Sequence, residues 1–296
     1  MIDKLSSAAH SGLPTVLDDV GFGDPGGEAP FVPTNLARDM MTLITITHSR
    51  QRMSAFAGPV GIGKTRAILA LAEGNETELA VIKVAGDKSI SEIQFLLAVT
   101  NQLRRKLGAD EIESKALGRS TIHRAFRSTL AHWGKAGPHM DKTKRTIIVD
   151  EAQSLAPAAI SAIRFWNDPD GCLGPYPVGF AFVGNQEFSL QPSKTGQSAL
   201  SYAVADRLLY SENYSYCDVT DDDIRAYVQS FEIVAEPAIE LVIKNLARLS
   251  PTRSLRAVNR LLDELKAHAR GGALDTSAFH SAFDGKLSAR MQRAAA

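Results

Sequence analysis

The spacing of hydrophobic positions changes near residue 219, and this change divides the chain into two parts. Before it, apolar runs of strand length alternate with longer segments of helical periodicity, as in a parallel sheet with helices on both faces. After it, only helical periodicity remains. We therefore predict an α/β domain over residues 35–219 and a small all-helical domain over 220–296. The Gly- and Pro-rich segment 1–34 is expected to be a flexible arm.

Each short apolar run predicts a strand, and each longer periodic segment predicts a helix. The five expected strands lie at 53–57, 79–84, 146–149, 178–183 and 214–219. The helices expected in the first part lie at 36–46, 66–71, 90–107, 120–133 and 157–166, and Thr34 or Asn35 is placed to cap the first of them. In the second part we expect helices at 224–231, 237–249, 255–268 and 276–283.

A glycine-rich motif follows the first predicted strand. Residues 58–65 read Gly-Pro-Val-Gly-Ile-Gly-Lys-Thr, which matches the phosphate-binding loop pattern G-x-x-x-x-G-K-[ST]. Its glycines let backbone N–H groups turn toward phosphate oxygens, and the following helix presents its positive end. The motif predicts an ATP site in which Lys64 contacts the β and γ phosphates and Thr65 holds Mg²⁺. The other residues expected to bind the nucleotide are Gly58, Gly61, Ile62, Gly63 and Arg66.

Two carboxylates, Asp150 and Glu151, end the predicted strand at 146–149. Because the carboxyl ends of parallel strands converge where ligands bind, we expect both side chains beside the phosphates. Asp150 is suited to hold Mg²⁺ through water, and Glu151 to polarise the attacking water. Alone, such a pair is also typical of a solvated helix cap; in combination with the phosphate loop it indicates ATP hydrolysis.

The two motifs, the helical second part and Asn185 together resemble AAA+ ATPases. Within that group the chain resembles the transposition ATPases related to the phage Mu B protein. This finer resemblance is carried by Asp-Glu-Ala-Gln-Ser-Leu at 150–155, Ile-Arg-Phe at 163–165 and Val-Gly-Phe-Ala-Phe-Val-Gly-Asn at 178–185. It covers about residues 35–270 and implies a P-loop AAA+ parallel sheet core with a C-terminal helical lid.

The resemblance also implies roles for three further residues. Asn185 matches the polar sensor that positions the hydrolytic water, although it also suits a simple turn closing the strand. Arg207 matches an arginine finger that acts on the neighbouring subunit, and it also suits a solvated cation at a helix end. Arg256 matches the second sensor, which reaches from the lid to the γ-phosphate, with Arg253 as the alternative.

Overall charge gives no argument for nucleic-acid binding, because 33 Lys and Arg balance 33 Asp and Glu. Local basic clusters indicate either sequence-independent, salt-sensitive contacts with duplex DNA or ordinary solvated helix faces. One cluster contains Arg104, Arg105, Lys106, Lys115, Arg119, Arg124 and Arg127, and the other Lys244, Arg248, Arg253, Arg256, Arg260, Lys266 and Arg270. The Gly-rich segment before Asn35 is unsuited to the helix-turn-helix that the Mu protein carries ahead of its ATPase, so we expect no base-specific targeting from it.

The composition favours a cytoplasmic protein without membrane contact. There are only 2 cysteines among 296 residues, no run of about 18 apolar residues and no signal-peptide pattern. Our first interpretation is an AAA+ ATPase that uses ATP and Mg²⁺, assembles as a ring or filament on DNA and prepares that DNA for a transposase-like partner. The alternatives are an ATP-dependent switch for a protein partner in secretion, replication or defence, and a scaffold with negligible turnover.

Overall fold

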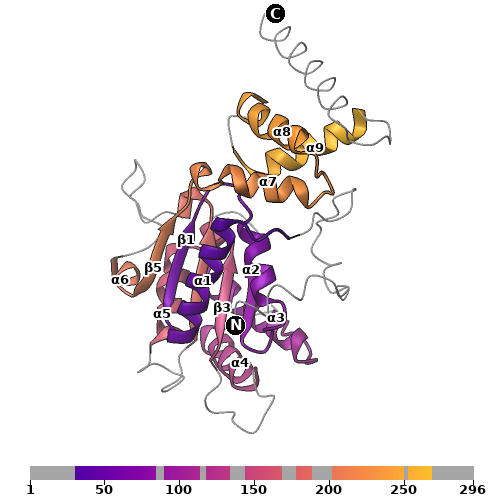
Figure 1. The fold of residues 1–296 in the computed structure, drawn as a ribbon. Coiled ribbons are helices and arrows are strands. Elements are labelled where there is room, and N and C mark those ends of the chain that lie inside the picture. The colour runs from indigo at the N-terminus through magenta and orange to yellow at the C-terminus, as the bar shows by residue number, and fades with distance from the viewer. Residues whose placement is uncertain are drawn as a thin grey trace, which may run out of the picture. The chain divides into compact units, whose positions relative to one another are not determined.

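A computed structural model describes residues 31–84, 90–113, 118–133, 144–168, 178–188, 202–249 and 253–268. Five parallel strands form one sheet in the order β2-β3-β4-β1-β5 (Figure 1). The strands are β1 Met53–Ala57, β2 Leu79–Lys83, β3 Thr146–Asp150, β4 Gly179–Gly184 and β5 Leu208–Asn213. This is an α/β fold built on a parallel sheet, with the glycine-rich motif directly after β1, as the sequence predicts.

Helices cover both faces of the sheet. In the α/β part these are α1 Asn35–Arg50, α2 Lys64–Ala72, α3 Glu92–Lys106, α4 Arg119–His132, α5 Pro157–Asn167 and α6 Tyr202–Ala205. The short 3-10 helices are η3 Ala152–Ser154, η4 Gln186–Phe188 and η5 Tyr216–Asp218, and the later helices are α7 Asp221–Gln229, α8 Glu236–Leu249 and α9 Leu255–His268. Thr34 caps α1, since its hydroxyl accepts from the Ala37 N–H at 3.2 Å. The helix predicted at 276–283 lies outside the described residues.

Alternate side chains of the central strands pack into two separate hydrophobic clusters, one on each face of the sheet. In β4, Ala181 and Val183 face the cluster that contains α1 and α2, whereas Phe180 and Phe182 face the cluster formed with α3, α4 and α5. Every residue of β4 is consequently buried. Burial on both faces explains why this strand appears in the sequence as an almost continuous apolar run.

The strand predicted at 214–219 is wrong, because β5 occupies Leu208–Asn213 instead. β5 is an edge strand whose residues are only partly buried, so its sequence mixes Leu and Tyr with Ser, Glu and Asn. The stretch predicted as a strand instead contains η5, where the Ser215 N–H donates to Asp218 Oδ2 at 2.6 Å and the Ser215 hydroxyl accepts from the Cys217 N–H at 3.2 Å. Such local hydrogen bonds compete with strand pairing.

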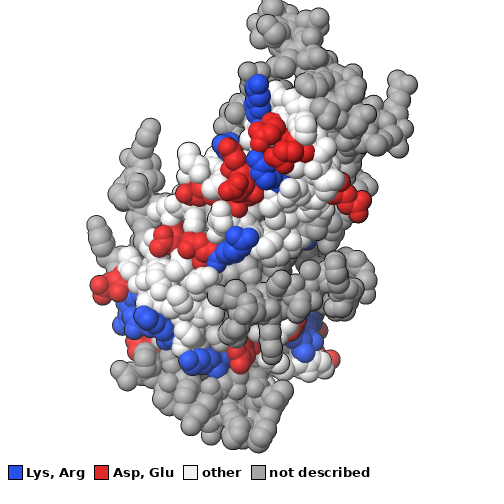
Figure 2. Space-filling view, viewed as in Figure 1, with Lys and Arg blue, Asp and Glu red and all other residues white. Residues whose placement is uncertain are grey.

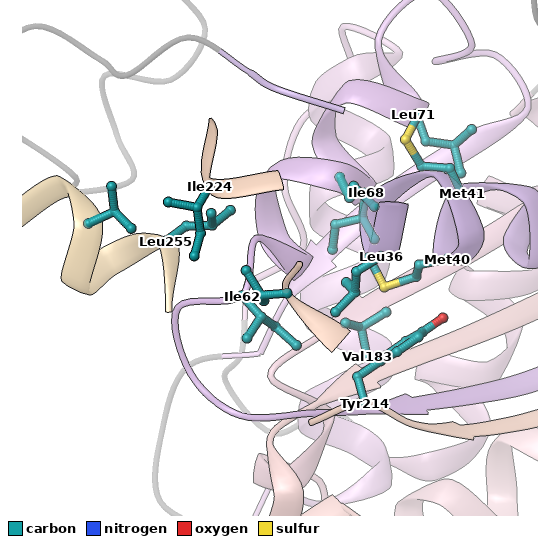
Figure 3. Close-up of a cluster of buried hydrophobic side chains, with 14 of the residues drawn as sticks. Leu36, Met40, Met41, Ile62, Ile68, Leu71, Val183, Tyr214, Ile224 and Leu255 are labelled. Atoms are coloured by element: carbon teal, nitrogen blue, oxygen red, sulfur yellow. The ribbon is translucent and has the colours of Figure 1, made fainter. Parts of the chain in front are cut away.

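The phosphate loop is anchored in the cluster that also contains residues of α7 and α9. Ile62, at 0% exposure, belongs to the same cluster as Leu36, Ile224 and Leu255 (Figure 3). A second link joins α7 to the start of α1, where Asp223 accepts from the Asn35 N–H at 2.7 Å. The boundary expected at residue 219 stays a prediction. None of the helices in the described part of the chain is long and apolar enough to cross a membrane.

Candidate nucleotide-binding site

The phosphate loop connects β1 to α2 and requires glycine at two of its turns. Gly61 has φ +86° and Gly63 has φ +97°, a backbone region that residues with a Cβ rarely adopt. Space is also restricted, because a Cβ at Gly61 would lie 2.8 Å from the Cβ of Arg256. The loop therefore passes directly against the first turn of α9.

Lys64 is the first residue of α2, and its ammonium folds back over the loop. Its Nζ donates to the carbonyl oxygens of Gly58 and Pro59, both at 2.8 Å. Burial lowers the pKa of Lys64, while the charges of Asp150 and Glu151 oppose that shift. The positive charge is thus held above a loop whose sequence matches a phosphate binder, where phosphate oxygens can replace the two carbonyls as acceptors.

Thr65 and Asp150 come together from distant parts of the sequence. The Thr65 hydroxyl, in the first turn of α2, donates to Asp150 Oδ2 at the end of β3 at 2.9 Å. Asp150 is 3% exposed; its burial raises its pKa, and the Thr65 hydrogen bond opposes that shift. Hydroxyl and carboxylate oxygens suit Mg²⁺, which prefers hard oxygen ligands and completes its shell with phosphate and water. The two predicted metal residues therefore fit the ion chemically.

Glu151 leaves β3 through a left-handed turn. Its φ of +59° is unusual for a residue with a side chain and costs about 1 kcal/mol. Its carboxylate accepts a hydrogen bond from Gln153 Nε2, and Gln153 Oε1 in turn accepts from the Asn185 N–H at 3.0 Å. Gln153 thereby links Glu151, after β3, with Asn185, after the neighbouring strand β4. Gln153 belongs to the 150–155 motif that carries the resemblance, but the sequence assigns it no role, because its contacts depend on this turn.

Asn185 directly follows β4 and is half-buried. Its side-chain Oδ1 accepts from the Glu187 N–H at 2.9 Å, which closes the turn into η4. The turn expected as the alternative to a sensor is therefore present. This turn uses the Asn185 side-chain oxygen as an acceptor. The Asn185 Nδ2 is then the group suited to donate to a phosphate or a water molecule.

Arg256 and Arg253 lie in different surroundings. The Arg256 N–H donates to the Gly61 carbonyl at 3.3 Å, and its charge contributes to lowering the pKa of Lys64. Arg253 instead forms an ion pair with Asp221 at the start of α7. The structure thus brings Arg256 to the phosphate loop. Arg66 lies in the first turn of α2 and is exposed.

Arg207 is not brought to the other predicted site residues. It immediately precedes β5, whose Leu208 pairs with Met53 at the amino end of β1. The phosphate loop follows the opposite end of β1, roughly 13 Å away at the usual rise per strand residue. Arg207 Nη1 forms an ion pair with Asp168 Oδ2 at 2.9 Å. Arg207 therefore lies at the amino ends of the strands, whereas the phosphate loop of its own chain lies at their carboxyl ends.

The basic clusters are partly neutralised within the chain. In the first cluster Arg105 pairs with Glu111 at 2.8 Å and Arg119 with Glu92 at 3.0 Å. The face shown in Figure 2 accordingly carries both signs rather than a continuous basic surface. Four members of the predicted basic clusters are not described: Lys115 and Arg270 lie outside the described residues, and the side chains of Arg248 and Lys266 are not described.

Fold and site together define an α/β P-loop domain of the AAA+ type. Residues 47–191 match the AAA domain family. The ADP form of the Aeropyrum pernix ORC2 protein is similar to this structure, with a TM-score of 0.60, 15% identity, and coverage of 86% of this chain and 70% of that one. Cdc6p from Pyrobaculum aerophilum gives a TM-score of 0.57 at 15% identity, with 88% and 65% covered. A search of curated proteins finds no match to the chain.

Proposed function

We propose that this chain binds Mg-ATP at the phosphate loop and hydrolyses it. The observation that carries the proposal is the 2.9 Å hydrogen bond between Thr65 and Asp150, two motif residues separated by 85 positions. Their meeting beside the Lys64 ammonium assembles the parts that a triphosphate requires. Thr65 and Asp150 would hold Mg²⁺, which would supply positive charge against the phosphates. The structurally similar ORC2 protein was determined in an ADP form, which supports a nucleotide as the ligand.

The residues after β3 and β4 supply the hydrolytic chemistry in this proposal. Glu151 polarises the attacking water and takes up its proton, as a carboxylate general base does. The side-chain Nδ2 of Asn185 orients that water or the γ-phosphate from the next strand. Arg256 adds positive charge from α9 as the γ-phosphoryl group passes from ADP to water, since its backbone already contacts the loop at Gly61.

Arg207 serves a neighbouring subunit rather than its own site. Its position at the amino ends of the strands separates it from the phosphate loop of the same chain, which lies at their carboxyl ends. An arginine there completes a site only when a second copy presents its phosphate loop to that edge. We therefore propose that the active form is a ring or filament with nucleotide at each junction.

The proposed cellular task is the preparation of duplex DNA for a transposase-like partner. It rests on the resemblance of 150–155 and 178–185 to transposition ATPases and on the two basic clusters. The ion pairs of Arg105 and Arg119 reduce the charge available for phosphate contacts. This observation favours, as the second candidate, a nucleotide switch that controls a protein partner without DNA.

The rate of ATP hydrolysis, measured with and without duplex DNA at two salt concentrations, distinguishes these functions. The proposal predicts Mg²⁺-dependent turnover that DNA stimulates, with stimulation that fades as salt rises because phosphate contacts release counterions. Turnover that DNA leaves unchanged at low salt would favour the switch. ATP binding without turnover would favour the scaffold and contradict the proposed hydrolysis.

A further inference from the structure

Gln153 touches two parts of the proposed hydrolytic centre with the two ends of one amide. Its Nε2 donates to the Glu151 carboxylate, and its Oε1 accepts from the Asn185 N–H at 3.0 Å. The two contacts define which way the amide points. A reversed amide would set Oε1 against a carboxylate oxygen and Nε2 against an N–H donor, and both pairs repel.

The surroundings of Gln153 hold its side chain in this place. Gly184 leaves room for the amide, because a Cβ there would lie 3.0 Å from Gln153 Oε1 and 2.6 Å from the Cβ of Phe188. The turn that carries Gln153 is closed by a hydrogen bond from the Ser154 N–H to the Glu151 carbonyl at 2.9 Å. Ala152 and Ser154 on either side are buried and anchor the turn.

We propose that Gln153 is a positioning residue that fixes the orientation of the Glu151 carboxylate and ties it to the end of β4. The inference rests on the proposed hydrolysis at this site. A glutamate side chain has three rotatable torsions, and a carboxylate that samples several rotamers faces the attacking water for only part of the time. A donor held by both β4 and η3 restricts this sampling. Gln153 therefore acts on turnover through Glu151 and leaves nucleotide binding to the phosphate loop.

Two substitutions separate hydrogen bonding from packing. Gln153→Met keeps a side chain of similar length and removes both hydrogen bonds, whereas Gln153→Glu keeps the acceptor for the Asn185 N–H and places a like charge beside Glu151. Both should lower kcat by about tenfold or more, the usual cost of losing a residue that orients a reacting group. KM and the affinity for a fluorescent ATP analogue should stay within about twofold of wild type. Gln229→Met, at the exposed end of α7, is the matched control.

A double variant tests whether the effect passes through Glu151. In single-turnover hydrolysis, adding Gln153→Met to Glu151→Gln should cause no further loss, because the orientation of a missing carboxylate no longer matters. A purely structural role would lower the rate by the same factor in both backgrounds, which would overturn the proposal. Thermal unfolding of each variant identifies any that fail to fold; the isosteric Gln153→Glu then carries the test.

Different patterns of turnover among these variants would contradict the positioning role of Gln153 and the proposed hydrolysis. If Glu151→Gln turns over slowly while Gln153→Met and Gln153→Glu match the Gln229→Met control, the positioning role is wrong and hydrolysis at the site stands. If Glu151→Gln turns over at the wild-type rate, the proposed hydrolytic role of Glu151 is wrong, and the positioning role fails with it.

Discussion

Arg253 and Arg256 are close in the sequence but lie in different surroundings, Arg253 before α9 and Arg256 in its first turn. The Arg256 N–H donates to the Gly61 carbonyl, and a Cβ at Gly61 would lie 2.8 Å from the Cβ of Arg256. Arg253 is held by Asp221. The sequence left both open as the lid sensor, because sequence spacing does not show which of them faces the loop.

Replacement of these two arginines should therefore have different effects. Arg256→Ala should lower kcat by roughly tenfold to a hundredfold, because a charge that stabilises the phosphoryl group in transfer is lost. Arg253→Ala removes a partly exposed ion pair and should leave kcat within about threefold of wild type. Steady-state kinetics on both variants provides the comparison. A larger loss for Arg253→Ala would exchange the two assignments.

The motif residues of the site could be predicted because their chemistry is local in the sequence. Lys64, Thr65 and Asp150 each stand at a fixed position in a recognisable pattern. Gln153 could not be predicted in the same way. Its role depends on the left-handed turn at Glu151 and on the space that Gly184 leaves beside it, and both depend on the folded chain.

At the scale of elements, burial determines which strands the sequence reveals. The four strands buried as almost continuous apolar runs were predicted within one or two residues of their observed bounds. β5 was missed because its residues are at most half-buried and its second half is polar, whereas β2 at the other edge of the sheet is mostly buried and apolar. Of the two residues that the sequence offered as the cap of α1, Thr34 and Asn35, Thr34 is the one that caps it.

Asp223 connects two elements that are far apart in the sequence. Its side chain accepts from the Asn35 N–H at 2.7 Å and from the Thr220 N–H at 3.0 Å, and it is 3% exposed. It thus satisfies donors at the start of both α1 and α7. This buried carboxylate joins the first helix of the α/β part to the first helix of the later part.

Asp223→Ala should accordingly lower the free energy of unfolding by about 2 kcal/mol, because two backbone donors lose their acceptor. Asp222→Ala is the matched control, since Asp222 is exposed in the same turn of α7. Its loss should cost less than about 1 kcal/mol. Urea unfolding of both variants measures the difference. Equal costs would show that helix-end charge, rather than the bridge to α1, gives Asp223 its effect.

At the scale of the whole molecule, the position of Arg207 is the basis for the proposal that neighbouring copies share a site. It lies at the amino ends of the strands, away from the phosphate loop at their carboxyl ends, and is paired with Asp168. A site that needs this arginine must obtain it from another copy. Assembly would then be a condition of turnover rather than a consequence of it.

Mixing inactive variants tests this shared site. Arg207→Ala should keep its ATP affinity and lose roughly 10³-fold or more in turnover, as expected for an arginine finger. Lys64→Ala should lose nucleotide binding and still present Arg207. Mixed together, the two should recover part of the activity at junctions with one intact site. Asp168→Ala, which removes the ion pair and keeps the arginine, should stay within about threefold of wild type. A rate per subunit that mixing does not raise would contradict a shared site.

The most direct test of the account is single-turnover hydrolysis of bound Mg-ATP by Glu151→Gln. The amide keeps the shape of the carboxylate and loses the charge that polarises water. We predict a hydrolysis rate that is lower than wild type by a factor of roughly 10² to 10⁴. The ATP affinity should be nearly unchanged, because the Lys64 loop is intact. A rate within about threefold of wild type would contradict the assignment of Glu151 and with it the mechanism proposed for this site.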